Sequence, residues 1–149
     1  MAVDNDAIKE LLLSNRKAAK SEMDAILTAD RLEHDFFAGH LYSYVLYKFM
    51  LDPSKTTEKG FNALTDLSMS QSMKISPELV KQFDLAQSCD GTSSAMAKKV
   101  LLFRNIEKTL DIQLPAMATA RIKTLSDLCE LTWDTLCQSH VWQSKIMGA

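Results

Sequence analysis

The stretch that decides the fold is Ile106-Glu107-Lys108-Thr109-Leu110-Asp111-Ile112-Gln113-Leu114-Pro115, followed after a short interval by Ile122-Lys123-Thr124-Leu125-Ser126-Asp127-Leu128. Ile106 and Leu110 are spaced as on one face of a helix, and Pro115 cannot continue that helix. Thr124 or Ser126 can cap the next one. The stretch therefore predicts two helices joined by a short turn.

The rest of the chain also favours helices over sheets. Four glycines and three prolines among 149 residues leave long uninterrupted segments, and eight methionines add to the helix-forming residues. Apolar spacing and capping residues predict helices over residues 7–27, 30–50, 56–69, 76–85, 95–110 and 124–141. The expected fold class is all-α.

Composition excludes several classes of protein. The formal net charge of −2 argues against a nucleic-acid binder, which would present a basic face. The longest apolar segment, 36–50, is too short to span a bilayer, and the N-terminus does not resemble a secretory signal. The three cysteines form no Cys-x-x-Cys motif, as is typical of a reducing compartment. We expect a cytoplasmic protein without membrane or nucleic-acid partners.

Residues that could support catalysis or metal binding are few. Glu33, His34, Asp35 and His40 lie in one predicted helix, but His34 and His40 do not share a face and no Glu-x-x-His pair occurs. We expect no metal site, and we expect His40 to be hydrogen-bonded and partly buried. Cys89 precedes a helix start, but no histidine spacing points to a nucleophile relay. The chain is not expected to be an enzyme.

Aromatic residues concentrate in the predicted helix 30–50. Phe36, Phe37, Tyr42, Tyr44 and Tyr47 cover much of its circumference. They are consistent with the main core, with a pocket for an acyl chain, or with a homodimer or partner face.

The two phrases quoted at the start resemble the second half of an acyl or peptidyl carrier protein. In that family a helix ends in an apolar, acidic-or-Gly, apolar, polar, apolar, Pro pattern, and the last helix opens with Ile-x-Thr-apolar-x-Asp-Leu. The resemblance covers about residues 85–140. It implies a carrier-protein-like four-helix bundle over 76–149, with additional N-terminal helices in a region 1–75 that is either separate or part of the same domain.

The resemblance also implies a cofactor and its attachment site. A carrier holds an acyl or aminoacyl group as a thioester on a 4'-phosphopantetheine arm, which is attached to a serine at a helix start. Here the matching loop is Asp90-Gly91-Thr92-Ser93-Ser94-Ala95-Met96. An alignment without gaps from Pro115 places the modified serine on Met96. Either Ser93 or Ser94 is therefore the attachment point, with Asp90 and Gly91 shaping the approach to it, or the fold has no arm.

Partners follow from the same resemblance. A phosphopantetheinyl transferase would load the arm from coenzyme A, and an acyl- or aminoacyl-activating enzyme would charge it. Four basic residues against one acidic residue give 95–110 a net charge of +3, whereas fatty-acid carriers have an acidic helix there. The expected bundle core contains Val100, Phe103, Ile106, Leu125 and Leu128. The alternative is a non-catalytic helical adaptor or dimerisation module that binds a protein partner through the aromatic helix.

Overall fold

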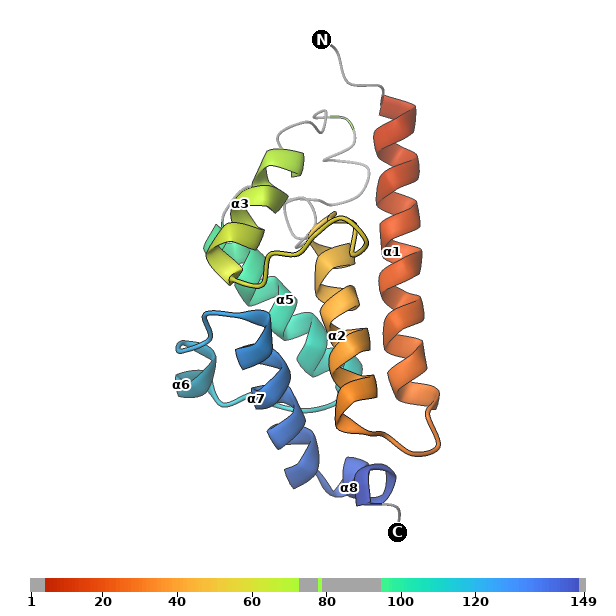
Figure 1. Ribbon diagram of the computed structural model, residues 1–149, viewed down its shortest axis with the longest axis vertical. Coiled ribbons are helices and arrows are strands. Elements are labelled where there is room, and N and C mark those ends of the chain that lie inside the picture. Colours follow the sequence, from red (N-terminus) through yellow and green to blue (C-terminus); the bar gives the residue numbers. More distant parts are fainter. Residues whose placement is uncertain (1–4, 73–77, 79–94, 148–149) are drawn as a thin grey trace.

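The computed structural model describes residues 5–72, 78 and 95–147 of the chain. Within these residues the secondary structure is helical, and the only strand-like feature is one isolated β-bridge. The helices shown in Figure 1 are α1 (Asn5–Thr28), α2 (His34–Lys48), α3 (Phe61–Ser72), α5 (Ala95–Leu110), α6 (Ala116–Thr119), α7 (Leu125–Gln138) and α8 (His140–Met147). The expected all-α class is confirmed for this part of the chain.

Helices α1 and α2 form an antiparallel pair along one side of the molecule (Figure 1). α1 buries one stripe at helical spacing and exposes the opposite face, as an amphipathic surface helix does. The stripe consists of Ile8, Leu12, Asn15, Ala19, Met23 and Ile26. α2 packs against α1 on one side and α7 on another, so most of its circumference is buried.

The aromatic residues of α2 mainly form the core. Phe37 is fully buried and Tyr44 is 4% exposed, whereas Phe36 is 42% exposed. Of the three interpretations of this aromatic helix, the structure supports the main core. Tyr42 and Tyr47 are half-buried against the same core.

Three predicted helices differ in the structure. α2 begins at His34, not after Asp30, and the backbone N–H of Leu32 donates to the carbonyl of Lys145 in α8. α3 begins at Phe61, because its backbone N–H donates to the carbonyl of Lys123 and not to a residue four positions earlier in the chain. The predicted helix 124–141 is divided into α7, which ends at Gln138, and α8, which begins at His140. The predicted helix 76–85 lies outside the described residues, apart from residue 78.

The deciding stretch forms the two predicted helices, α5 and α7, but the interval between them contains a short helix, α6, in addition to the predicted turn. α5 ends at Leu110, and Asp111 adopts a left-handed conformation with φ 54°, which aspartate tolerates better than most residues. Pro115 is the N-cap residue of α6. Thr124 caps α7 in a capping box: its hydroxyl accepts from Asp127 N at 3.1 Å, and the Asp127 carboxylate accepts from Thr124 N at 3.1 Å.

One buried cluster contains residues from both halves of the chain. It includes Met23 of α1, Leu41 of α2, Phe61 of α3, Ile106 of α5 and Leu128 of α7. α8 closes one end, where the indole N–H of Trp142 donates to the carbonyl of Leu110 at 2.8 Å and the Lys145 ammonium donates to that of Leu27 at 2.6 Å. No helix in the described ranges is long and apolar enough to cross a membrane.

Candidate functional site

The residues expected to hold the arm, Asp90, Gly91, Ser93 and Ser94, lie outside the described residues. What the structure does describe is the helix that follows them in the sequence. α5 begins at Ala95, and the side chain of its second residue, Met96, is 77% exposed. The position that the ungapped alignment assigns to the modified serine is thus an exposed position in the first turn of a helix.

The predicted core of this region is mostly right. Ile106, Leu125 and Leu128 are at most 1% exposed, and Phe103 is half-buried against the core. Val100 is not a core residue, because it is 49% exposed. Leu102, Ile106 and Leu110 form the buried stripe of α5, and Val100 lies on a second apolar stripe that faces away from it.

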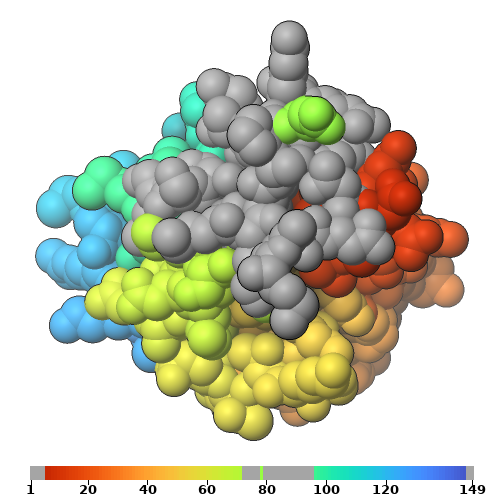
Figure 2. All heavy atoms as spheres, turned by 90° about the horizontal axis from the view of Figure 1, so that it is seen from above, coloured from red at the N-terminus to blue at the C-terminus, as the bar shows by residue number. Residues whose placement is uncertain are grey.

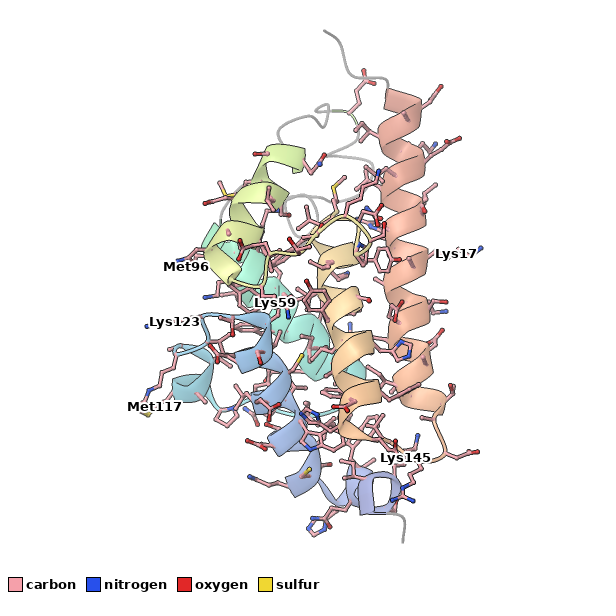
Figure 3. The ribbon with its side chains drawn as sticks, in the orientation of Figure 1. Lys17, Lys59, Met96, Met117, Lys123 and Lys145 are labelled. Atoms are coloured by element: carbon pink, nitrogen blue, oxygen red, sulfur yellow. The ribbon has the colours of Figure 1, made fainter. Side chains whose placement is uncertain are left out.

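The second stripe of α5 lines a groove, which we call the methionine groove. Its volume is about 410 Å³, within the range of ligand pockets, and it is formed by α3, α5 and the residues at the end of α6. Its lining consists of Asn62, Thr65, Met96, Lys99, Val100, Phe103, Thr119 and Ala120. Met117 of α6, which is 78% exposed, extends from the same edge of the molecule as Met96 (Figure 3).

Lys99 holds the wall of the groove in place. Its ammonium lies 3.4 Å from the carbonyl oxygen of Ile122 and 5.4 Å from the centre of the Phe61 ring. The Phe61 ring in turn meets that of Phe103 edge-on, at 5.9 Å between centroids. One positive charge is therefore fixed beside an apolar surface.

The turn between α6 and α7 adds further charges. Arg121 and Lys123 are exposed on either side of Ile122. The backbone N–H of Lys123 donates to Asp127 at 3.0 Å, and this bond and the bonds from Thr124 hold the pKa of the Asp127 carboxyl below its usual range. Asp127 thus stays ionised over the ordinary pH range and fixes the start of α7.

The groove could be recognised only in part from the sequence. The missed residues are Asn62, Thr65, Thr119 and Ala120, on segments distant from α5 in the chain. The sequence of α5 contained one indication of the groove, because Met96, Val100 and Phe103 form a second apolar set at helical spacing beside the Leu102 stripe. Sequence periodicity could not show which stripe faced the core.

The two histidines of α2 link neighbouring helices. His34 Nε2 lies 2.7 Å from Glu130 Oε1 of α7 and its Nδ1 lies 3.2 Å from Asp35 Oδ1, and the hydrogen bonds with Asp35 and then Glu130 raise the pKa of His34. His40 is half-buried and its Nδ1 is within hydrogen-bond distance of Glu22 of α1, as predicted. Among the described residues no three His, Cys, Asp or Glu side chains gather as metal ligands would.

The two described cysteines, Cys129 and Cys137, are free thiols on α7. Cys129 is 7% exposed, and burial raises the pKa of its thiol to about 12. Burial also raises the pKa of Cys137, which is half-buried. Cys89 lies outside the described residues. These thiols are suited to packing, and the groove is suited to binding.

Comparison of the chain with models of known protein families, with characterised proteins and with solved structures finds no match in any of the three.

Proposed function

We propose that the chain is a carrier-protein-like domain, which holds an acyl or aminoacyl group as a thioester on a phosphopantetheine arm and presents it to partner enzymes. The observation that carries this proposal is the geometry of 106–128. The position that the family fills with Gly or an acidic residue is Asp111, at φ 54°. Left-handed backbone explains that preference physically, because glycine and aspartate tolerate it.

The other residues of the two phrases also have structural roles that suit the pattern. The carboxylate of Glu107 accepts from the backbone N–H of Leu114 at 2.9 Å, which holds the turn after α5. Pro115 starts α6, and Thr124 and Asp127 form the capping box of α7.

In the proposed carrier, Ser93 or Ser94 receives the arm and Asp90 and Gly91 shape the approach to it. The backbone N–H groups of a helix start favour a phosphate group, and α5 begins directly after Ser94 in the sequence. A phosphopantetheinyl transferase supplies the arm from coenzyme A, and an acyl- or aminoacyl-activating enzyme supplies the cargo. This chain carries the group and does no bond chemistry itself.

The test is loading of the arm in vitro. The purified protein is incubated with coenzyme A and a broad-specificity phosphopantetheinyl transferase, and its intact mass is read. A gain of one phosphopantetheine group that is lost in Ser93→Ala or in Ser94→Ala supports the proposal and identifies the serine. Ser126→Ala, an exposed serine on α7, is the matched control and should load like the wild type. No gain in a folded sample, beside a carrier that loads, contradicts the proposal.

A second candidate is an adaptor of the same fold without an arm. It is favoured by Met96, which occupies the position of the modified serine and exposes a large apolar side chain at the edge of the methionine groove. Its binding surface would be this groove, because Met96 and Val100 are exposed there, whereas Phe37 and Tyr44 of α2 are buried. The loading experiment separates the two candidates.

A further inference from the structure

We propose that the methionine groove binds an acidic amphipathic helix from a partner protein. The inference deepens the adaptor candidate and does not depend on the arm. It rests on the apolar side chains that the groove exposes, on the sign of the charge around it, and on its position on the molecule.

The apolar surface of the groove is exposed rather than covered. Met96 is 77% exposed and Val100 is 49% exposed, and Met117, which is 78% exposed, extends from the same edge of the molecule as Met96 (Figure 3). Exposed apolar side chains that gather at a hollow are typical of an interaction site. Methionine is flexible and adapts to the shape of a partner helix.

The surroundings of the groove are basic although the chain is acidic. Apart from Lys98, which is fully buried, the three segments 58–66, 95–104 and 116–127 contain five basic residues and three acidic ones, a net charge of +2 against −2 for the whole chain. The exposed cations on these segments are Lys59, Arg104, Arg121 and Lys123, with Lys99 at the wall. Such a rim favours an acidic partner.

The acidic residues near the groove do not reverse this charge. The carboxylate of Glu58 accepts from the backbone N–H groups of Lys59 and Gly60, at 3.0 and 2.9 Å. The carboxylate of Asp127 accepts hydrogen bonds from the backbone N–H groups of Lys123 and Thr124 at the start of α7. The third acidic residue of these segments is Asp66, which lies one turn beyond Asn62 on α3.

A helix suits this site better than other occupants. The first turns of α5 and the α6–α7 segment lie on the same side of the molecule, opposite α1 (Figure 2), and the groove between α5, α3 and α6 is concave and apolar. Helices bind such grooves through apolar anchors at i, i+3 or i+4, and i+7. Nucleic acid would instead favour a broad basic face with stacking aromatics.

A second copy of this chain is a weaker fit. Its most acidic described helix is α7, with Asp127, Glu130 and Asp134 and no basic residue. Three leucines of that helix, Leu125, Leu128 and Leu136, are buried in its own core, and the fourth, Leu131, is half-buried against it, so the helix offers no row of exposed anchors. An acidic helix from another protein that exposes apolar residues would supply both the negative charge and the apolar anchors.

The probe is a fluorescein-labelled peptide of about 16 residues, with leucines at i, i+3, i+4 and i+7 and glutamates on its other faces. Fluorescence anisotropy with the full chain measures its affinity. We expect saturable binding that weakens as salt rises, because the rim contributes charge. The same peptide with lysines in place of the glutamates should bind at least about tenfold more weakly.

Two pairs of variants make the test specific. Val100→Asp places a carboxylate in the groove and should weaken binding at least about tenfold, whereas Val141→Asp, at a 68% exposed position on α8, should leave it unchanged. Lys123→Glu should weaken binding about three- to tenfold. Its control, Lys17→Glu, lies on the opposite edge of the molecule (Figure 3). All four positions are exposed, so unfolding midpoints should match the wild type.

Several results would overturn the proposal. The first is no binding at about 100 μM peptide, a concentration at which a weak micromolar complex would form. The second is equal peptide binding by Val100→Asp and Val141→Asp. The third is equal affinity of the protein for the glutamate and lysine peptides. Self-association of the protein that Val100→Asp abolishes, without peptide binding, would assign the groove to a second copy instead. Arm loading is read by mass on the same variants, so failure of one proposal is distinguishable from failure of the other.

Discussion

Replacement of Phe61 by alanine tests the central packing of the structure. Phe61 is fully buried at the start of α3, where its ring lies 6.5 Å from that of Phe49 and 5.9 Å from that of Phe103. Phenylalanine-to-alanine changes in cores cost about 3–5 kcal/mol of unfolding free energy. Because Phe61→Ala removes two aromatic pairs and the ring beneath Lys99, we expect a loss of about 4 kcal/mol.

The matched control is Phe36→Ala, since Phe36 is 42% exposed and its ring contacts mainly that of His40 at 4.4 Å. It should cost about 1 kcal/mol or less. Urea unfolding followed by far-UV circular dichroism gives both values, with an unchanged denaturant slope if unfolding stays two-state. In a chain of this size each kcal/mol lowers the melting temperature by about 2–4 °C, so Phe61→Ala should melt about 8–16 °C below the wild type.

The reasoning would be refuted if Phe61→Ala cost no more than Phe36→Ala, because the ring would then not be in the core. Should Phe61→Ala fail to fold, Phe61→Leu keeps an apolar side chain and should give an intermediate loss. Phe103 lines the methionine groove against Phe61, so the same variants should also weaken binding of the acidic peptide.

Two further predictions concern titratable groups. The raised pKa of His34 means that its contacts with Asp35 and Glu130 stabilise the fold below the ordinary histidine pKa of about 6.5, and that this contribution is lost as pH rises through the raised value. An NMR titration of the His34 ring should therefore show a lower midpoint in Asp35→Asn than in the wild type. Equal midpoints would show that Asp35 does not raise the pKa of His34. The pKa of about 12 predicts that Cys129 resists a thiol reagent at neutral pH until the protein unfolds. With Cys89 replaced by Ser, Cys137 should react first, and equal rates would show that Cys129 is accessible.

The bounds of α5 and the capping of α7 were predictable because their determinants are local. Small polar residues precede Ala95, and Pro115 and Asp111 define the turn that follows. The capping box needs only Thr124 and Asp127, three residues apart. The attachment site was predicted from a resemblance, and its four residues lie outside the described part of the chain.

Errors in the prediction occurred where distant segments meet. The start of α3 moved to Phe61 because residues 59–61 pair with residues 123–125, and the segment before α2, which starts at His34, bonds to Lys145 of α8. Neither partner is near in the sequence. Helix propensity is worth a few tenths of a kcal/mol per residue, so a buried backbone hydrogen bond to a distant segment decides such a boundary.

By itself the sequence determined the helical class, the turn after α5 and the cap of α7, because composition, helical spacing and capping act over a few residues. Only the tertiary structure decided which face of α5 is the core. Both the Leu102 stripe and the Val100 stripe are apolar, and packing against the neighbouring helices buried the first and left the second open as the wall of a groove. Which of two apolar faces finds a partner within the chain depends on segments that no local pattern connects.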